Sequence, residues 1–413
     1  MDKNLVIVGA SYAGAQLAAS ARDKGFEGRI LLVGEEAHLP YQRPPLSKGF
    51  LTGKVTEASL AMRSPAFYAE ERIEFKSEAR VAAIDRNARE VSLASGERIP
   101  YDFLGLTTGA RCRELGCEGA DLAGVHYLRG VDDAKRLTAA AADAERVVII
   151  GGGFIGLEVA ASLRAVNKRV TVIESQPRLL ARAFPEMLSR FIHSVHASNG
   201  IEFVFGGRIG RLNGRNGKVE SVELADSQVI PCDLVLVAIG VIPNTGLAEA
   251  CGLTVSDGIV VDACARTSDP AIVAAGDCAR YPNPWGAAGT VDIRLESVQS
   301  ANDLARAAAS TVAGLSEPYS AVPWFWSDQG ELKLQMTGLS AGADQMVVRG
   351  EIDGKRFSVF YFSDGKFCAV DTVNHPAEHI QARKLLAARV PFSPAQASDV
   401  TVNLKALIPG APT

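Results

Sequence analysis

Two short stretches combine glycines at a spacing that could hold the diphosphate of a dinucleotide. In the first, Gly9 and Gly14 enclose four small or aromatic residues, and in the second Gly151, Gly153 and Gly156 stand in a similar arrangement. Glycine lets the backbone approach a pyrophosphate closely, and a following helix offers free N–H groups and the positive end of its dipole. The pattern therefore predicts two phosphate-binding turns.

Each turn is followed by an acid that could bind a ribose. Glu35 lies 21 residues after Gly14, and Glu174 lies 18 residues after Gly156. A carboxylate at this place accepts a hydrogen bond from a ribose 2′-hydroxyl. Ser11 replaces the middle glycine of the first turn, and its small side chain is compatible with the turn. The alternative is a pair of tight strand-to-helix turns without ligands, but the duplication of the whole pattern favours two dinucleotide sites.

The residues around both turns predict repeated strand–turn–helix–strand units. Short β-branched runs precede and follow an alanine-rich or apolar helical stretch in each unit. The strands are expected at 4–8, 29–33, 146–150 and 169–173, and the helices up to about Asp23 and from Leu157 to about Val166. Three further apolar runs, 101–110, 233–240 and 272–277, end in or near glycine and predict strand ends that approach a ligand.

The last hundred residues have a different pattern. Runs at 333–336, 345–348 and 356–362 alternate or are continuously apolar, and Ser363–Lys366 is a hairpin-turn signal. A helix is expected from about Pro376 to Ala388. This pattern predicts an antiparallel α+β domain after two α/β units.

Composition excludes several classes of protein. The 413 residues carry 43 basic and 47 acidic side chains, a net charge of −4, which is not typical of a nucleic-acid or anionic-lipid binder. The longest apolar stretch carries Glu158 in its middle, so no membrane span is expected. Seven scattered cysteines and the absence of a signal-like N-terminus favour a reducing cytoplasm.

The cysteines also argue against thiol chemistry. No C-x-x-x-x-C follows the first glycine turn, where residues 43–48 read RPPLSK, and no C-x-x-C lies in the second unit. Cys112 and Cys117 have four residues between them but follow the run 101–110, so we interpret them as structural. No Cys or His spacing is typical of a zinc or iron–sulfur site, and no metal is expected in this chain.

Seven segments together resemble the flavoprotein ferredoxin reductases of bacterial oxygenase systems, which belong to the pyridine nucleotide-disulfide oxidoreductases but lack the redox disulfide. The segments are VGASYAG, PYQRPPLSK at 40–48, TTGA at 107–110, GGGFIGLE at 151–158, AAGDCA at 274–279, RLESVQSAND at 294–303 and WFWSDQG at 324–330. The resemblance implies an α/β fold with two Rossmann-like domains, for FAD and NAD, and a C-terminal α+β domain. The domains are expected at 1–113 with 247–318 (FAD), 114–246 (NAD) and 319–413.

The resemblance further implies hydride transfer from NADH to FAD and single-electron transfer to a 2Fe–2S ferredoxin that feeds a haem monooxygenase or a Rieske dioxygenase. The residues implied for FAD are Gly9, Ala13, Gly14, Glu35, Arg43, Pro44, Lys48, Val81, Arg129, Asp277 and Val298. Those expected for NAD are Gly151, Gly153, Ile155, Gly156, Glu174, Arg182 and Gly240. The alternative for Asp277 is the N-cap of a helix beginning at Cys278.

Three residues are candidates for a direct role in the reaction. The resemblance places Lys48 and Glu158 near the flavin, where a lysine could stabilise the negative charge that reduction adds. The alternative is a solvated lysine and a surface glutamate. Trp326 is expected to cover the ring system near the nicotinamide, and the alternative is core packing at a domain junction.

Two other functions stay open on the sequence. One is a reductase of rubredoxin, a quinone or oxygen, and the other is an apoptosis-inducing-factor-like flavoprotein that binds partners or DNA. An acidic ferredoxin would need positive charge near the flavin edge. Arg306, about two helical turns beyond Val298, is the residue expected to provide it.

Overall fold

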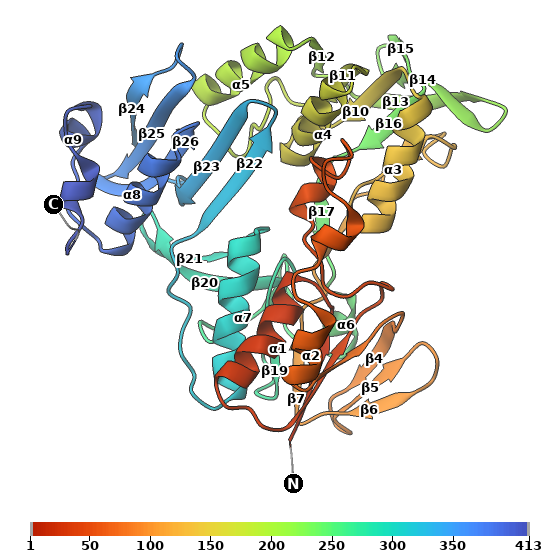
Figure 1. The fold of residues 1–413 in the computed structure, drawn as a ribbon, viewed down its shortest axis with the longest axis vertical. Helices are drawn as coiled ribbons and strands as arrows, with labels where there is room; N and C mark the ends of the chain where they lie inside the picture. Colours follow the sequence, from red (N-terminus) through yellow and green to blue (C-terminus); the bar gives the residue numbers. More distant parts are fainter. Residues whose placement is uncertain (1–2, 411–413) are drawn as a thin grey trace.

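The first unit forms a parallel sheet in the computed structural model, which describes residues 3–410. Its sheet has the order β19-β7-β1-β2-β3 (Figure 1). The strands are β1 (Asn4–Val8), β2 (Arg29–Val33), β3 (Ile73–Lys76), β7 (Phe103–Leu106) and β19 (Ile272–Ala274). Val8 lies beside both Val33 and Leu106, so these three parallel strands end at one edge of the sheet.

Helix α1 (Tyr12–Asp23) follows the first glycine turn, as predicted. Its alanines are small, and the helix packs closely against α7 (Val298–Val312) on the same side of the sheet (Figure 1). Leu5 and Ile7 of β1 are fully buried, as is Leu17 of α1. Burial of these apolar side chains holds the first glycine turn in place between strand and helix.

The second unit repeats this arrangement. Its sheet has the order β12-β11-β10-β16-β9, and all its pairings are parallel. The strands are β9 (Val125–His126), β10 (Arg146–Ile150), β11 (Arg169–Glu174), β12 (Ile201–Phe205) and β16 (Leu234–Val237), and the helices are α3 (Val131–Asp143), α4 (Phe154–Ala165) and α5 (Glu186–Ser198). Helix α4 begins at Phe154, three residues before the expected Leu157, because the glycine turn itself leads directly into the first helical turn.

A two-stranded antiparallel ladder joins the two units. It consists of β8 (Ala110–Cys112) and β17 (Val241–Pro243). The chain leaves the first unit through β8 and returns through β17 before β19 completes the first sheet. This path supports a discontinuous first domain, while the exact boundaries at 113, 246 and 318 stay predictions.

Several small elements decorate the two units, and most of them carry no strong local signal. They are α2 (Pro65–Glu70), α6 (Gly246–Ala250), the sheet β4-β5-β6 (Val81–Asp85, Glu90–Leu93, Arg98–Pro100), the sheet β13-β14-β15 (Ile209–Arg215, Lys218–Leu224, Val229–Pro231), the sheet β18-β20-β21 (Ile259–Val260, Ala279–Gly286, Gly289–Ile293) and the 3₁₀ turns η1 (Pro44–Ser47), η2 (Glu57–Leu60) and η3 (Leu404–Leu407).

The C-terminal domain is an antiparallel sheet with helices, as the alternating pattern predicts. The strands β22 (Trp324–Gln329), β23 (Leu332–Gly338), β24 (Gln345–Glu351), β25 (Arg356–Ser363) and β26 (Lys366–Val373) have the order β22-β23-β26-β25-β24, followed by α8 (Pro376–Ala387) and α9 (Pro394–Ser398). The predicted hairpin turn is present, with φ of 49° at Asp364 and 71° at Gly365.

An apolar interface joins this domain to the second unit. Leu179, Phe184 and Leu188 pack in one cluster with Leu332 and Phe357 of the C-terminal sheet. Figure 1 shows β22 and β23 facing α4 and α5 across this interface. The fold class is therefore confirmed as two Rossmann-like units with a C-terminal α+β domain. Between residues 3 and 410, no helix combines the length and apolar content needed to cross a bilayer.

Candidate functional site

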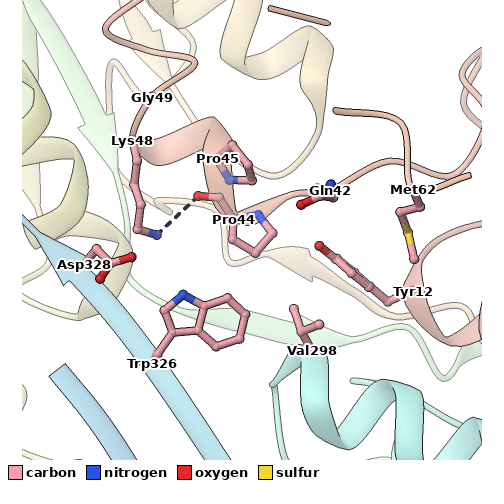
Figure 2. Close-up of a pocket in the computed structure, with 10 residues that line it drawn as sticks. All are labelled: Tyr12, Gln42, Pro44, Pro45, Lys48, Gly49, Met62, Val298, Trp326 and Asp328. Atoms are coloured by element: carbon pink, nitrogen blue, oxygen red, sulfur yellow. Dashed lines mark hydrogen bonds between the residues drawn. The ribbon is translucent and has the colours of Figure 1, made fainter. Parts of the chain in front are cut away.

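A cavity of about 980 Å³ extends from the first glycine turn to the beginning of α4. A second cavity of about 580 Å³ (Figure 2) adjoins it, because Tyr12, Pro44, Lys48, Val298 and Trp326 line both. The residues expected at FAD that line the larger cavity are Gly9, Ala13, Glu35, Arg43, Pro44, Lys48, Val81, Arg129, Asp277 and Val298. The structure thus brings together residues that are widely separated along the chain.

The backbone of the first turn is shaped to receive an anion. Gly9 has a φ of +111°, and a Cβ there would lie 2.1 Å from the carbonyl oxygen of Thr107. Gly14 lies behind the turn, where a Cβ would lie 2.0 Å from the carbonyl oxygen of Gly9. Ser11, the N-cap of α1, makes no side-chain cap and the first helical turn has no acid. The first N–H groups of α1 are therefore available to a diphosphate, and the residues fit a dinucleotide.

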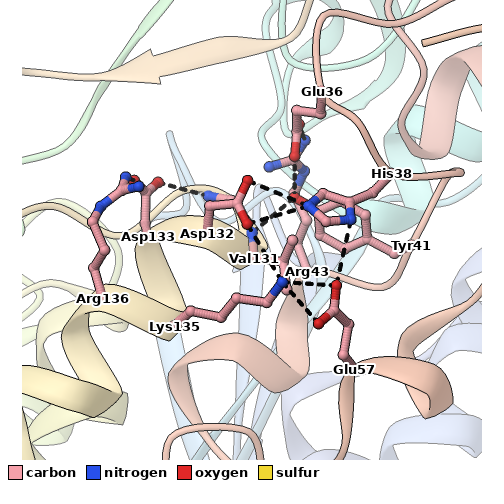
Figure 3. Close-up of polar contacts among 11 residues, drawn as sticks. Glu36, His38, Tyr41, Arg43, Glu57, Val131, Asp132, Asp133, Lys135 and Arg136 are labelled. Atoms are coloured by element: carbon pink, nitrogen blue, oxygen red, sulfur yellow. Dashed lines mark hydrogen bonds and ion pairs between the residues drawn. The ribbon is translucent and has the colours of Figure 1, made fainter. Parts of the chain in front are cut away.

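Arg43 supplies positive charge beside this turn. Its guanidinium donates to Ser11 Oγ at 3.2 Å and to the carbonyl oxygen of Arg129 at 2.8 Å, and it pairs with Glu36. Tyr41 donates to the same Glu36 carboxylate and accepts from a backbone N–H of α3 (Figure 3). Sequence reasoning selected Glu35 and missed Glu36, because nothing in a single sequence shows which of two adjacent acids turns inward.

A second group of polar contacts surrounds this one. His38 lies between Asp132 and Glu57, and Lys135 binds the same two carboxylates (Figure 3). These contacts tie η2 to the beginning of α3. They hold the segment that carries Arg43 against the second unit.

Asp277 forms an ion pair with Arg129 at the cavity. Asp277 Oδ2 lies 2.8 Å from Arg129 Nη2, and both residues line the cavity. The alternative of a helix N-cap is wrong, because the residues after Asp277 lead into strand β20 at Ala279 and not into a helix.

Lys48 and Glu158 also form an ion pair, with Lys48 Nζ 2.7 Å from Glu158 Oε2. Glu158 lies on α4 with a side chain only 4% exposed, so the alternative of a surface glutamate is wrong. Ser47 Oγ donates to the same carboxylate at 2.5 Å, and Ser327 Oγ of β22 donates to its other oxygen at 2.7 Å. Sequence reasoning missed both serines, although the alternation of β22 could have placed Ser327 on the face opposite Trp326.

Trp326 borders both cavities and is only half-buried. Its ring stacks on that of Trp324, with centroids 5.4 Å apart and planes 30° apart. Figure 2 shows Trp326 between Lys48 and Val298, with Asp328 on the same strand. Its side chain therefore forms a wall of the cavity and does not fill a domain core.

The second turn has the same glycine geometry as the first. Gly151 has a φ of +113°, and a Cβ there would lie 2.3 Å from the carbonyl oxygen of Ala238. A Cβ at Gly156 would lie 2.1 Å from the carbonyl oxygen of Gly151. Gly153 is the N-cap of α4, and no side chain caps it. This turn therefore also fits a dinucleotide.

The residues expected at NAD are only partly brought together. Ile155 is 46% exposed and lines the large cavity, whereas the rest of that set does not line it. An ideal Cβ at Gly240 would lie 3.8 Å from Arg182 Nη2, so these two residues are neighbours. Glu174 accepts from the backbone N–H of Gly152 at 2.7 Å, which turns its carboxylate back into the glycine turn.

Neither thiols nor a metal cluster mark this site. All seven cysteines are free, and burial raises the pKa of Cys112 and of Cys117. Among residues 3–410, no group of three or more His, Cys, Asp and Glu side chains could hold a metal ion. Arg306 is exposed, pairs with Asp303 and lines neither cavity.

Two glycine turns that each fit a dinucleotide, and a cavity with a buried Lys–Glu pair and a tryptophan at its wall, define a two-dinucleotide oxidoreductase. Residues 3–302 match the pyridine nucleotide-disulphide oxidoreductase family, and residues 324–408 match the reductase C-terminal family. The chain belongs to the pyridine nucleotide-disulphide oxidoreductases. It is an FAD-dependent enzyme that uses a nicotinamide dinucleotide, as members of this family do.

Similar proteins cover nearly the whole chain. Rhodocoxin reductase of Rhodococcus erythropolis is 46% identical over 98% of this chain and 94% of its own length. Putidaredoxin reductase of Pseudomonas putida is 39% identical over 99% of this chain and 98% of its own length. A crystal structure of the covalent putidaredoxin reductase–putidaredoxin complex matches with a TM-score of 0.95 and 39% identity, covering 99% of both chains.

Proposed function

We propose that this protein passes electrons from NADH, through bound FAD, to a 2Fe–2S ferredoxin that feeds an oxygenase. The observation that carries this proposal is the cavity that extends from the first glycine turn to the beginning of α4. The similarity to rhodocoxin reductase and putidaredoxin reductase supports a ferredoxin as the acceptor. The oxygenase would be a haem monooxygenase or a Rieske dioxygenase.

FAD would be held by the residues of the first unit. The free N–H groups at the beginning of α1 and the Arg43 guanidinium would bind its diphosphate. Glu35 would accept from the adenosine ribose and Val81 would contact the adenine. When bound, FAD accepts a hydride and releases the two electrons singly, which neither side chains nor NADH can do alone.

The residues that line the cavity would set the environment in which the flavin accepts and releases electrons. Lys48 would place a fixed positive charge at the wall, and its pairing with Glu158 keeps that charge in position. Trp326 would cover the cavity and exclude water from it. Ile155, exposed at the beginning of α4, would offer an apolar contact to the nicotinamide.

The test is a purification followed by an acceptor panel. The protein should be yellow, and acid should release the flavin intact, because no covalent attachment is needed. Reduction by NADH should then be measured with a purified 2Fe–2S ferredoxin, a rubredoxin, a quinone and oxygen. A colourless protein from a flavin-replete host contradicts FAD binding, and faster turnover with any other acceptor contradicts the ferredoxin.

A non-catalytic role would require a different partner. DNA binding at physiological salt in a gel-shift assay, together with no ferredoxin reduction, would favour an apoptosis-inducing-factor-like flavoprotein. The net charge of −4 disfavours that outcome.

The place of action and the domain limits complete the proposal. Seven unpaired cysteines support a reducing compartment, and we place the protein in the cytoplasm. We assign residues 1–113 and 247–318 to an FAD domain, 114–246 to an NAD domain and 319–413 to a C-terminal domain. The three five-stranded sheets support this division.

A further inference from the structure

A chain of buried polar side chains runs from α5 to the wall of the cavity. His196 Nε2 lies 2.8 Å from Gln329 Oε1, and Gln329 Nε2 lies 3.1 Å from Ser327 Oγ. Ser327 Oγ in turn lies 2.7 Å from Glu158 Oε1. None of these four residues is more than 3% exposed, so water does not compete for their hydrogen bonds. The chain connects the second unit with the C-terminal strand β22 and returns to the second unit at α4.

One hydroxyl proton gives this chain its direction. Glu158, paired with the Lys48 ammonium, only accepts, so Ser327 must donate its single proton to it. The Ser327 oxygen must then accept from the amide nitrogen of Gln329, and the amide oxygen of Gln329 faces His196. His196 must therefore donate from Nε2. Every donor in the chain points toward Glu158, and hydrogen bonds aligned in this way polarise one another.

The groups around His196 agree with this assignment. Burial lowers the pKa of His196, which favours the neutral ring with a single N–H. Glu331 and His193 are the other titratable groups that influence it. With its single proton on Nε2, neutral His196 satisfies the amide oxygen of Gln329.

The chain crosses an interface that contains a large apolar cluster. Leu188, Ile192 and Val195 of α5 belong to this cluster together with Leu332 and Leu334 of the C-terminal sheet. A polar side chain in such a place destabilises the fold unless it is hydrogen-bonded. The four members of this chain are each bonded to the next, so the interface tolerates them.

Strand β22 carries both the chain and the wall. Trp326 and Asp328 line the cavity (Figure 2), while Ser327 and Gln329 are buried on the opposite face of the strand. Hydrogen bonds that hold Ser327 and Gln329 in place therefore also hold the cavity-lining face of the same strand in place.

The other carboxylate oxygen completes the arrangement. Glu158 Oε2 accepts from Ser47 at 2.5 Å and lies 2.7 Å from Lys48 Nζ. With both oxygens bonded, the carboxylate cannot rotate without losing a partner. The row of hydrogen-bonded side chains contacts Lys48 directly through this carboxylate.

We propose that Ser327 and Gln329 are positioning residues, which hold Glu158 turned toward Lys48 and so fix the Lys48 ammonium at the cavity wall. The inference rests on the proposed function for the ligand that Lys48 faces. Its effect on Lys48 itself can be measured whether or not flavin is bound.

The experiment compares Ser327→Ala and Gln329→Leu with Ser327→Thr, which keeps the hydroxyl. Ser358→Ala is the matched control, because Ser358 is also fully buried and also donates to a buried glutamate, Glu378, away from the cavity. The full chain, as purified, is acetylated with trace acetic anhydride, and mass spectrometry gives the labelling rate of Lys48 relative to the exposed Lys54.

Ser327→Ala and Gln329→Leu should raise this ratio by about two- to tenfold, the change that one lost hydrogen bond produces. Ser327→Thr and Ser358→Ala should leave it unchanged. Stopped-flow reduction of the flavin by NADH should slow by a similar factor in the first two variants, with KM for NADH unaltered. An unchanged ratio in both variants, or an equal rise in Ser358→Ala, overturns the proposal.

A measurement on the unsubstituted protein guards against variants that fail to fold. Nitrogen-15 NMR of labelled histidines should show His196 neutral with its proton on Nε2, and the opposite tautomer overturns the direction of the chain. Purified protein without flavin would contradict the proposed function, but the Lys48 ratio and the His196 tautomer would still decide this inference.

Discussion

The two glycine turns share a backbone geometry but use their acids differently. Gly9 and Gly151 have φ values of +111° and +113°, and a Cβ on either would meet a carbonyl oxygen of the neighbouring strand's end. In the first unit Glu35 is exposed, with Arg80 3.9 Å away. In the second, Glu174 accepts from the N–H groups of Gly152 and Gln176. The same motif can thus leave its acid to a ligand or use it to brace its own turn.

The surroundings of the two helices differ as well. Helix α1 is covered by α7, whereas α4 is covered by β22 of the C-terminal domain. The first unit therefore presents an unbraced turn with Arg43 beside it. The second unit contributes Glu158, whose charge Lys48 balances at the cavity of the first. The second unit therefore has a glycine turn of its own and, in addition, contributes Glu158 to the cavity of the first unit.

The largest expected effect comes from adding one methyl group to each turn. Gly9→Ala should lower the flavin content of the purified protein about tenfold or more, because the Cβ would overlap the Thr107 carbonyl and α1 would shift. Gly151→Ala should keep its flavin but raise KM for NADH about tenfold or more. The measurements are the ratio of flavin absorbance to protein absorbance and steady-state kinetics with ferricyanide.

Circular dichroism and thermal melting are the controls for folding in both variants. If Gly151→Ala lost flavin as completely as Gly9→Ala, the assignment of FAD to the first turn and of NADH to the second would be wrong. Equal KM values for Gly151→Ala and the unsubstituted protein would contradict an NADH site at the second turn.

Local signals explain why so much of the fold could be predicted. Apolar β-branched runs such as 4–8 and 146–150 form strands wherever they can be buried, and a glycine turn marks where the helix must begin. The predicted strands agree with β1, β2 and β10 residue for residue, and with β11 except for its last residue. The small sheets β4-β5-β6 and β13-β14-β15 were missed because their strands, such as β4 and β13, are largely exposed and do not form buried apolar runs.

The site was predictable only where a residue belongs to a motif. Ser47, Ser327 and Gln329 lie within the segments that carry the resemblance, but nothing in those segments shows their partners, which come from contacts between distant parts of the chain. The inward turn of Glu36 and the bonding of Glu174 depend on neighbours that a single sequence does not reveal. The roles of the residues assigned to FAD and NAD stay predictions.

The second effect concerns the choice of nicotinamide cofactor. A 2′-phosphate about 4 Å from the Glu174 carboxylate would be opposed by about 4 kcal/mol at an effective dielectric constant near 20. After screening, we expect kcat/KM for NADH to exceed that for NADPH by about ten- to several-hundred-fold. The positive charges of Arg178 and Arg182 temper this preference, although Arg178 already donates to the carbonyls of Ala181 and Phe184 and to Ser189.

Two substitutions separate the effect of the Glu174 charge from the effect of its hydrogen bond to the glycine turn. Glu174→Gln keeps an oxygen for the Gly152 N–H but removes the charge, so it should lower the preference about tenfold with little change in KM for NADH. Glu174→Ala should lower the preference and also weaken NADH binding. Equal kcat/KM for NADH and NADPH in the unsubstituted protein would contradict the assignment, and Arg182, near Gly240, would then be the first residue to substitute.

A smaller effect is expected where α7 covers the first unit. Arg306 is exposed but paired with Asp303, so only part of its charge is available to an acidic ferredoxin. Arg306→Glu should raise KM for ferredoxin about two- to fivefold at low salt and leave NADH-to-ferricyanide turnover unchanged. Asp303→Asn is the matched variant, because it frees the Arg306 charge and should lower KM.

Salt should diminish both changes, since exposed charges are screened beyond about 10 Å at 0.1 M ionic strength. Kinetics of ferredoxin reduction at several salt concentrations provide the measurement. If Arg306→Glu altered neither KM nor its salt dependence, docking would have to use another surface.

The smallest expected effect is that of blocking the cysteines, since each unit has a buried thiol in its apolar core. Burial raises the pKa of Cys278 in the first unit and raises that of Cys232 in the second to about 12. The thiolate is the reactive form, so neither side chain should react with iodoacetamide at pH 7 in the folded protein. Cys112, Cys117, Cys251 and Cys264 are only half-buried and are therefore the most accessible, and burial raises their pKa values as well. Electron transfer between two dinucleotides needs no thiol, so NADH-to-ferricyanide turnover should fall by no more than about a fifth after alkylation.

Mass spectrometry identifies the modified residues. Activity lost in proportion to the modification of one cysteine would show that one of the two units uses that thiol after all.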